Sequence, residues 1–536
     1  MATVPEPPVP EPPVPELTSY DHVPYKSFPF RQSHPDRLAT IATLHGLTIP
    51  KIENSRILEI GCASGGNLLP IADQYPSCQC VGIDLSSHQI AAGNRIREAA
   101  GLENVSLRVQ DVRELASSDQ TFDFVISHGV YSWIPDDAQE SLLQACGKLL
   151  SPNGVAYVSY NTYPGWHMRG MIRDMMAYHT RSIESPEDRV RKARALLHFL
   201  TESVPTEGSP YGLLLKQELG QLQDKEDYYL LHEHLEEFNQ PTYFSQFVER
   251  AQAWGLQYLG EADYSVMSID NFSPTVTAML QNLAADIIET EQYMDFVRNR
   301  MFRQTLLCRK ECKIERTVSA NRLSGLYIAS NTRPEGDVDS PDSDEPMTFL
   351  AGGSVTKTTN PGVKAALIHL GRTWPKFIPF AELLGIARSL TTGRIALIDT
   401  ASELRGNDRL GEALLRCYAT GHVELSVNPP QFSSVVAQCP DAGLLNRVMA
   451  AQRMPITNAR HESIHLSDIE RRILVMLDGN HDSSQLVAAI VSGVQKNEIV
   501  VHDRGICVSD PAAIERLANE VVDEMLKKLA RQTLLR

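Results

Sequence analysis

The 536-residue sequence has few cysteines, no long apolar run and no excess of positive charge. Its longest purely apolar stretches, such as 486–491, fall far below the roughly 18 residues that a membrane-spanning helix needs. The N-terminus has neither the basic nor the apolar region of a secretory signal. The nine cysteines, an odd and scattered set, are typical of reduced thiols. We therefore predict a cytoplasmic protein with no membrane insertion.

The charge balance indicates which classes of partner the protein can bind. Lys and Arg total 50 against 66 Asp and Glu, which gives a formal net charge of −16. Such a chain is poorly suited to holding nucleic acid or an anionic membrane through a general positive field. It would suit a basic partner, such as a polypeptide with an accessible lysine. At about 150 residues per domain, the length predicts three to four domains.

Short apolar segments alternate with helical segments between residues 56 and 160. Strands are expected at 56–60, 80–84, 105–111, 122–127 and 155–160. This alternation predicts a parallel sheet covered on both faces by helices. Strand character returns at 256–261 and 303–308, after a long helical stretch over 166–240. We interpret these as the last two strands of the same sheet, with the helical stretch as an insertion.

The C-terminal half divides into smaller units. Residues 329–346, rich in Asp, Ser, Pro and Asn, have no periodicity and are expected to be a domain linker. Beyond them, helices at 364–370, 379–389 and 403–419 precede a strand at 423–427. A capping box opens a helix over 467–477, and a second helix over 482–491, a hairpin of 498–501 with 506–508 and a long final helix follow. This order is that of a winged helix.

A glycine-containing loop follows the first predicted strand. Gly61 and Gly65 let the backbone approach a ligand where a Cβ would clash. Asp84 ends the second strand, where a carboxylate can bind both hydroxyls of a ribose, and Asp111 ends the third. The loop lacks both the dinucleotide pattern and the Lys-Ser/Thr of a phosphate-binding loop. An adenosine without a pyrophosphate fits these points better than a dinucleotide.

These motifs, Glu-Ile-Gly-Cys-Ala-Ser-Gly-Gly (59–66), Asp84 and Asp111-Val112, resemble the first three motifs of the class I S-adenosylmethionine-dependent methyltransferases. The resemblance implies S-adenosylmethionine as cofactor, S-adenosylhomocysteine as product, and no metal. It places the loop on the methionine moiety, Asp84 on the ribose, and Asp111 with Val112 on the adenine. The implied cofactor-binding residues are Glu59, Gly61, Cys62, Ala63, Gly65, Asn67, Asp84, Leu85, Asp111, Val112 and His128.

Further segments resemble one bacterial subgroup of this family. They are Tyr-Asp-His-Val-Pro-Tyr (20–25), Phe-Arg-Gln-Ser-His-Pro (30–35), His-Gly-Val-Tyr-Ser-Trp-Ile-Pro (128–135), Tyr-Asn-Thr-Tyr-Pro-Gly-Trp-His (160–167) and residues 232–244. The subgroup carries a methyltransferase regulatory domain and includes the rickettsial outer-membrane-protein lysine methyltransferases. The resemblance implies lysine side chains of proteins as methyl acceptors. The Pro-rich tail and the acidic linker depart from the pattern.

The ends of the fourth and fifth strands should flank the mouth of the cofactor site in this topology. His128, Tyr131, Asn161 and Tyr163 are therefore our candidates for catalytic residues that position the acceptor. For substrate binding, Tyr131 together with Trp133 and Trp166 can wall a channel for a lysine stem. Tyr20 and Tyr25 can close over the cofactor as a lid, a role that rests on the resemblance. For each aromatic residue, simple packing is the alternative.

Three other sequence features that could indicate a metal or DNA site have simpler explanations. His232 and His234 lie two apart on a helix and face different directions, and Cys308 with Cys312 lacks a second ligand pair, so we predict no metal site. The helix expected over 482–492 contains no Lys or Arg, which a DNA-gripping helix normally has. We therefore predict protein or interdomain contact for the winged helix, and no nucleic-acid partner.

The predicted fold is α/β: a Rossmann-like class I methyltransferase sheet with a helical insertion, plus C-terminal α+β winged-helix modules. The expected divisions are a Pro-rich tail (1–18), the methyltransferase core (19–180), the insertion (181–240), a regulatory region with the last strands (241–312), the linker (329–346), a winged-helix-like module (347–455) and a C-terminal winged helix (456–536). Protein lysine methylation is the preferred function. A small-molecule methyltransferase and a non-catalytic cofactor-sensing regulator or scaffold are the alternatives. The sequence leaves the oligomeric state open and admits a homodimer.

Overall fold

The computed structural model of the chain describes residues 23, 25–336, 341, 343, 345–391, 400–500, 502–503, 506–508 and 510–536. The predicted Pro-rich tail 1–18 and Tyr20 lie outside these residues. None of the helices in the described part of the chain is long and apolar enough to cross a bilayer.

A seven-stranded sheet forms the body, in the order β3-β2-β1-β4-β5-β7-β6. Its strands are β1 (Arg56–Ile60), β2 (Gln79–Asp84), β3 (Val105–Val109), β4 (Phe122–Ser127), β5 (Leu150–Asn161), β6 (Leu256–Glu261) and β7 (Phe302–Arg309). Strands β1 to β5 pair in parallel, whereas β7 runs antiparallel between β5 and β6. The predicted sheet, including the late return of its last two strands, is confirmed.

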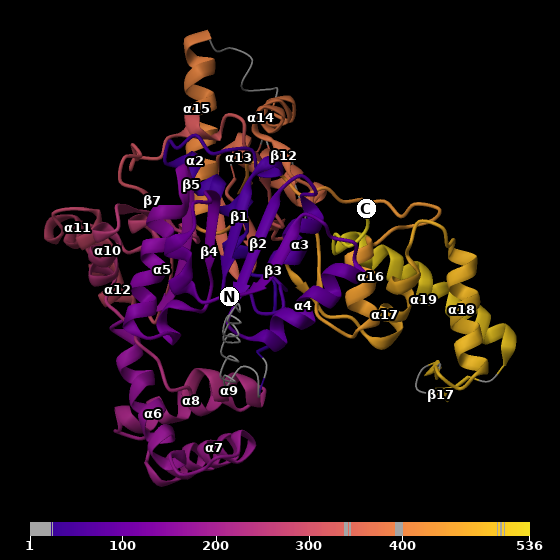
Figure 1. Ribbon diagram of the computed structural model, residues 1–536. Helices are drawn as coiled ribbons and strands as arrows, with labels where there is room; N and C mark the ends of the chain where they lie inside the picture. The colour runs from indigo at the N-terminus through magenta and orange to yellow at the C-terminus, as the bar shows by residue number, and fades with distance from the viewer. Residues whose placement is uncertain are drawn as a thin grey trace, which may run out of the picture.

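Helices cover both faces of this sheet (Figure 1). On one face, α2 (Pro35–Leu44), α3 (Leu68–Gln74) and α4 (Ser87–Ala99) contribute to one buried apolar cluster. On the other, α5 (Asp136–Leu149) and α10 (Phe244–Ala253) contribute to a second. Strands β1 to β5 and the helices between them therefore lie in the layered arrangement that their nearly continuous apolar runs predict.

The helical stretch after β5 is a helical arm of four helices, the first of which lies before residue 181, the predicted start of the insertion; the bounds of the insertion stay a prediction. These are α6 (Gly165–Thr180), α7 (Pro186–Ser203), α8 (Pro210–Leu222) and α9 (Asp227–His234). They share an apolar core of their own, and Figure 1 shows them together below the sheet. The chain returns to the sheet through α10, and α11 (Pro274–Leu283) and α12 (Ile287–Arg298) connect β6 to β7.

A middle module follows β7. One small sheet joins β8 (Tyr327–Ala329), β12 (Ile378–Pro379) and β13 (Glu424–Ser426), and another joins β9 (Arg333–Pro334), β10 (Met347–Ala351) and β11 (Ser354–Thr358). Its helices are α13 (Pro361–Thr373), α14 (Phe380–Ser389) and α15 (Thr400–Ala419). Part of the predicted linker 329–346 therefore belongs to this module, because β8 ends in it and β9 lies within it. A domain boundary in that range stays a prediction.

The C-terminal module has the expected winged-helix order, and it includes a helix at 444–451 that lies before the predicted start at 456. It contains α16 (Leu444–Ala451), β14 (Ile456–Thr457), β15 (Ser463–Ile464), α17 (Asp468–Met476), α18 (Ser483–Gln495), β16 (His502–Asp503), β17 (Ile506–Cys507) and α19 (Pro511–Arg531). The capping box at Ser467 is present. The hairpin begins at His502, not at the predicted 498. Asn497 adopts a left-handed conformation, and the amides of Glu498 and Ile499 instead cap α18 by donating to the Gly493 carbonyl.

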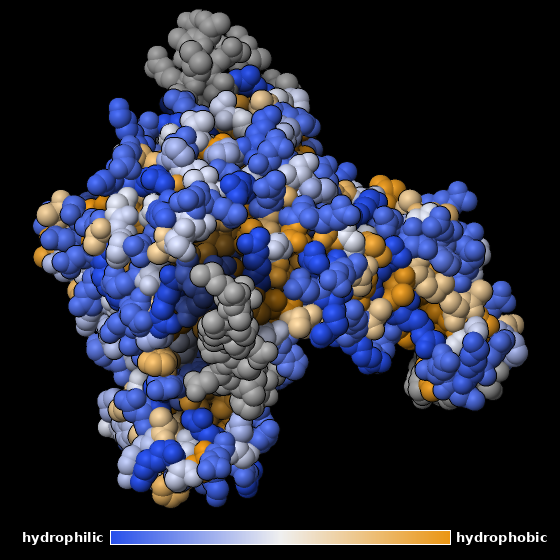
Figure 2. Space-filling model, in the orientation of Figure 1, coloured by the Kyte–Doolittle hydropathy of each residue, from blue (hydrophilic) through white to orange (hydrophobic). Residues whose placement is uncertain are grey.

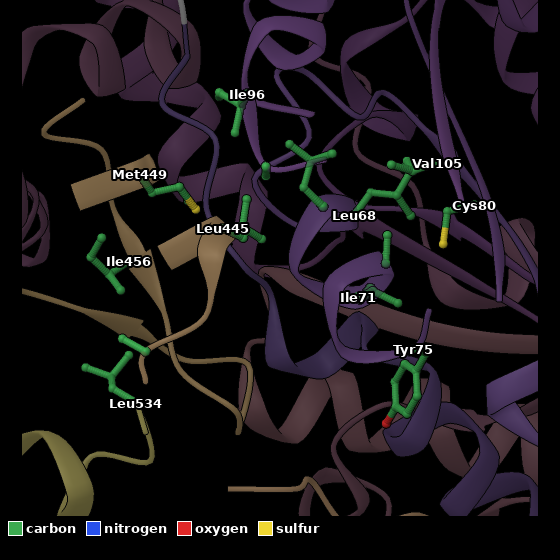
Figure 3. Packing of buried hydrophobic residues seen from close by; sticks show 14 of the residues in the cluster. Leu68, Ile71, Tyr75, Cys80, Ile96, Val105, Leu445, Met449, Ile456 and Leu534 are labelled. Atoms are coloured by element: carbon green, nitrogen blue, oxygen red, sulfur yellow. The ribbon is translucent and has the colours of Figure 1, made fainter. Parts of the chain in front are cut away.

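The C-terminal module shares a core with the body. Leu445 and Met449 of α16 belong to the same apolar cluster as Leu68 of α3 and Ile96 of α4, and Figure 3 shows these side chains close together. In Figure 2, apolar residues fill the recess where the module meets the body. The shared apolar core docks this module on the α3/α4 face.

A buried charge cluster ties β6 and β7 to α12. The fully buried Arg303 guanidinium donates to Asp295 at 2.8 and 2.9 Å, to Glu261 at 2.6 Å and to Glu291 at 3.0 Å. Arg300 lies 3.3 Å from Asp295. Two strands and a helix therefore meet around one arginine, whose charge is compensated only in this arrangement.

Replacing Arg303 should destabilise the protein strongly. Arg303→Ala leaves three carboxylates buried without their main donor, and we expect the free energy of unfolding to fall by about 3–5 kcal/mol. Urea unfolding monitored by circular dichroism measures this. Lys527→Ala, which removes an exposed ion pair with Asp523 on α19, is the control and should leave the unfolding midpoint unchanged. Equal effects of the two substitutions would contradict the assignment.

Candidate functional site

The loop after β1 has the backbone of a ligand cradle. Gly61 and Gly65 adopt φ of 76° and 78°, and Ala63 lies in the left-handed region at 48°. A Cβ on Gly61 would lie 2.3 Å from Cγ2 of Val130, so only glycine lets the loop pass this close to the end of β4. The Ala63 amide donates to Oδ2 of Asp84 at 2.8 Å, which holds the strained residue in place.

The predicted adenosine-binding residues lie on one edge of the sheet, after β2 and β3. Asp84 is partly exposed, and its Oδ1 accepts from the Ser86 amide at 2.9 Å. The neighbouring Leu85 is 49% exposed, an unusual position for a large apolar side chain. Asp111 caps the short helix that follows it and pairs with Arg113, while Val112 is buried. The structure thus brings the ends of β1, β2 and β3 together as the sequence predicts.

Glu59 and Asn67 form a buried polar pair beneath the loop. Nδ2 of Asn67 donates to Oε1 of Glu59 at 2.7 Å. The other carboxylate oxygen, Oε2, is buried with no hydrogen-bond partner in the described part of the chain. Burial raises the pKa of Glu59 from 4.5 to about 8. An unpaired buried carboxylate oxygen beside a glycine cradle fits a ligand that carries a cationic amino group, such as a methionine moiety.

Cys62 has a packing role in this loop. Its side chain is buried, and a Cβ on the facing Gly82 of β2 would lie 2.8 Å from its Sγ. Burial raises the pKa of the thiol well above its ordinary value. The small side chain thus lets the loop lie against β2, and the thiol is poorly suited to nucleophilic chemistry.

His128 lies at the end of β4 in an aromatic setting. Its ring stacks on Phe30, with centroids 3.7 Å apart, and the edge of Phe302 lies beyond it at 6.2 Å. Nδ1 of His128 lies 2.7 Å from the Tyr157 hydroxyl. Desolvation lowers the pKa of His128 to about 3, so the imidazole is neutral at ordinary pH. A neutral, partly exposed imidazole can accept or donate a hydrogen bond at this edge.

Tyr131 and Asn161, two other candidates, lie deeper than the sequence suggests. The Tyr131 ring is fully buried edge-on against Phe247 at 5.2 Å, which belongs to α10. Direct contact with an acceptor would require this ring to leave the core. Asn161 is also buried, and its Nδ2 donates to Oδ1 of Asn239 at 3.0 Å. Both side chains support the wall of the site at the positions described.

The remaining aromatic candidates form two groups of ring contacts near the start of α6. The partly exposed Tyr163 stacks on His167 at 4.0 Å and tilts toward Tyr243 at 5.3 Å. Trp133 and the buried Trp166 meet edge to face at 6.3 Å. The structure thus places Tyr163 and Trp166 near the start of α6, and Trp133, which lies in the same short helix as Tyr131, packs on Trp166.

Residues 25–33 form an N-terminal strap across the glycine loop. The Gly66 amide donates to Oγ of Ser27 at 2.7 Å, and the Phe30 amide donates to Oδ1 of Asn67 at 2.9 Å. Tyr25 accepts from Gln89 of α4 through its carbonyl and packs edge-on against Tyr228 of the helical arm. The lid role of Tyr25 stays a prediction, and its position between α4 and α9 is compatible with it.

Sequence reasoning missed several residues of this site. Tyr157, Ser27 and Phe30 support His128 and the loop, and His461 of the C-terminal module reaches Asn67 with Nε2 at 2.7 Å. Phe30 lies in a segment that the family resemblance singled out, so that segment could have suggested it. No local pattern marks His461, which lies far from the loop in sequence.

The histidine pair on α9 binds protein groups. His232 lies between the Val23 carbonyl at 2.7 Å and Glu236 at 2.6 Å, and His234 lies 3.1 Å from Glu218. Across the described residues, no group of three His, Cys, Asp or Glu side chains is arranged to hold a metal ion. The pair therefore connects Val23, which precedes the N-terminal strap, and α8 to α9.

The raised pKa of Glu59 predicts a stability cost for this site. Because the folded-state pKa exceeds the unfolded one, the folded chain binds a proton more tightly, and stability falls as pH rises from about 4.5 to about 8. Glu59→Gln removes this cost and should raise the free energy of unfolding at pH 7 by up to about 3 kcal/mol. Urea unfolding at pH 5, 7 and 8 should show the gain widening with pH. Glu53→Gln, at an exposed position before β1, is the control, and a gain independent of pH would contradict the cause.

Three family models match this chain. Residues 57–154 match a methyltransferase domain, residues 226–309 a predicted methyltransferase regulatory domain, and residues 439–534 a PKMT C-terminal winged helix domain. The three matches cover β1 to the start of β5 with the glycine loop, the segment from α9 to β7, and the C-terminal module.

Proteins that are similar over nearly the whole chain support the same family assignment. An uncharacterized protein of Rickettsia prowazekii, RP789, is 35% identical over 524 residues, which cover 96% of this chain and 93% of that protein. The structure of PKMT2 from Rickettsia typhi in complex with AdoHcy is similar with a TM-score of 0.84 and 32% identity, covering 96% of this chain and 100% of that one. A second structure of that protein gives 0.83. The chain belongs to the class I S-adenosylmethionine-dependent methyltransferases that carry a methyltransferase regulatory domain and a PKMT C-terminal winged-helix domain.

Proposed function

We propose that this methyltransferase transfers the methyl group of S-adenosylmethionine to lysine side chains of proteins. The observation that carries the proposal is the similarity to PKMT2 from Rickettsia typhi over 96% of this chain, helical arm and C-terminal module included. The sequence resemblance to rickettsial outer-membrane-protein lysine methyltransferases supports the same acceptor. The net charge of −16 suits a basic polypeptide.

The cofactor would be held by the residues gathered at the carboxyl edge of the sheet. The backbone of Gly61 and Gly65 would take the methionine moiety, Asp84 the ribose, and Asp111 with Val112 the adenine. Asn67 has its amide engaged by protein partners, so we assign it to holding the loop and not to direct contact. When bound, S-adenosylmethionine supplies an electrophilic methyl group on a sulfonium. Transfer of this methyl group depends mainly on the alignment of the attacking nucleophile, and less on an acid or base that acts on the leaving group.

The acceptor side must orient and desolvate an amine. A lysine with an ordinary pKa near 10.4 must lose a proton before it can attack, and a pocket poor in water lowers that pKa. Tyr163 and the Trp133–Trp166 pair would wall the apolar stem, and the neutral His128 would exclude water near the reacting amine. Asn161 and Tyr131 would act through the walls that they support.

Labelling distinguishes the acceptors. The purified protein is incubated with S-adenosylmethionine labelled in its methyl group and with bacterial cell extract. We expect label in the protein fraction, recovered as methylated lysine after acid hydrolysis. An extract whose lysines have been acetylated beforehand should accept far less label. Label confined to small molecules, or full labelling of the acetylated extract, would contradict the proposal.

Asp84→Ala should remove cofactor binding and activity together, because it deletes both the proposed ribose ligand and the acceptor that holds the Ala63 amide. Calorimetry with S-adenosylhomocysteine should show a loss of affinity of at least about 100-fold, equivalent to roughly 3 kcal/mol for a charge-assisted pair. Glu98→Ala, on the exposed face of α4, should bind normally. If the Asp84→Ala protein keeps its cellular role, a scaffold function gains support over catalysis.

A further inference from the structure

One side chain of the C-terminal module enters the cofactor site of the body. His461 lies in the turn between β14 and β15, is buried, and places Nε2 2.7 Å from Oδ1 of Asn67. Because an amide oxygen only accepts, Nε2 must carry the hydrogen. Burial, together with His34 and Arg31 nearby, holds the pKa of His461 well below its ordinary value, so the ring is a neutral donor.

The turn that carries His461 is built to present it. His461 adopts φ of 59°, a left-handed conformation that costs a non-glycine residue free energy. Its amide donates to the Asn458 carbonyl, and Oδ1 of Asn458 accepts from the amides of Arg460 and Glu462. Arg460 is fixed in turn by the Pro375 carbonyl and lies over the Trp374 ring. The strained residue is therefore held by several independent bonds.

At the other end of the bond, the amide of Asn67 is saturated. Its Nδ2 donates to Glu59 at 2.7 Å and to Ser33 at 3.1 Å, and its Oδ1 accepts from the Phe30 amide and from His461. An amide has two donor hydrogens and two acceptor sites, and all four are used. The His461 bond thus fixes which way the amide faces, and with it the Glu59 carboxylate and the strap that stacks Phe30 on His128.

We propose that His461 is a positioning residue for the cofactor site, acting from the C-terminal module through the side chain of Asn67 on Glu59 and the N-terminal strap. Docking of the module does not require this bond, since Leu445 and Met449 pack on the body and Arg536 pairs with Asp73 of α3. The bond links the module to the loop that would carry the cofactor.

Two substitutions of similar size separate the donor from the packing. His461→Leu removes the donor, whereas the amide of His461→Gln can place a donor close to the position of Nε2; both keep a side chain at the left-handed position. Calorimetry with S-adenosylhomocysteine should show affinity about 3- to 10-fold weaker for the Leu protein, as for loss of one hydrogen bond. The Gln protein should stay within about twofold of the unchanged protein.

The route through Asn67 is tested by a double-mutant cycle. In an Asn67→Ala background, His461→Leu should cause no further loss of affinity, because the intermediary is gone. Asp73→Asn breaks a contact between the same module and α3 that does not touch Asn67, and is the matched control. It should leave the affinity unchanged even if it lowers the melting temperature.

Four results would overturn the proposal. Equal losses for His461→Leu and His461→Gln would show that the donor is irrelevant. Additive losses with Asn67→Ala would show that His461 acts elsewhere. A lower melting temperature without any change in affinity would leave His461 a structural residue only. If neither His461 variant folds, the test passes to the Asn67→Ala protein, whose C-terminal module is intact. The proposal requires that this protein also lose a comparable amount of affinity. Normal binding by the Asn67→Ala protein would refute the route. Because the probe is the cofactor product, the outcome is independent of whether protein lysine is the acceptor.

Discussion

The fold depends on neutralising one fully buried guanidinium. Arg303 of β7 carries a charge that is costly to bury without a partner. The carboxylates that compensate it come from β6 and from two successive turns of α12. In the observed placement of these elements, Asp295, Glu261 and Glu291 all lie within reach of the same side chain. The segment after α12 leads directly back into β7. In this segment the carbonyl of Met301 accepts a hydrogen bond from the Thr162 amide, and the carbonyl of Arg300 accepts one from the Gly165 amide. The geometry at the end of β5, where the acceptor would enter, follows from that placement.

A second meeting point lies beneath the glycine loop. The N-terminal strap, β1, α3 and the turn before β15 converge on the Asn67 amide, so segments from both ends of the chain and from the sheet share one small polar cluster. A buried polar cluster is favourable only when all its members are satisfied. Among the described members of this cluster, Oε2 of Glu59 is the atom without a hydrogen-bond partner. The proposed site thus leaves one acceptor atom available for a cationic group of the ligand.

Sequence patterns predicted the sheet well because each of its strand–turn–helix units is encoded within a short stretch of the chain. A strand, a glycine turn and a helix form within about thirty residues, and the strands at 256–261 and 303–308 kept their apolar runs despite the insertion. The winged-helix order was also readable from caps and turns. Three aspects were not: the inward position of Tyr131, the inclusion of residues 333–334 in a sheet, and the hairpin start at His502. Each depends on a contact partner distant in sequence, or on the way a preceding helix ends. His461 is the extreme case, because nothing around it distinguishes a buried donor from a surface histidine.

The position of β7 has a consequence for how the chain acquires its structure. This strand is the last of the seven to be synthesised, yet it lies inside the sheet between β5 and β6. Until residue 309 has left the ribosome, β5 presents an open edge, and β6 has no neighbour with which to pair. Open strand edges invite association with other chains, and pairing over such long separations is slow. The helical arm, with its own apolar core, can form during this interval and keep its own surface covered. The edges of the nascent sheet therefore stay open to association with other chains until β7 has been synthesised.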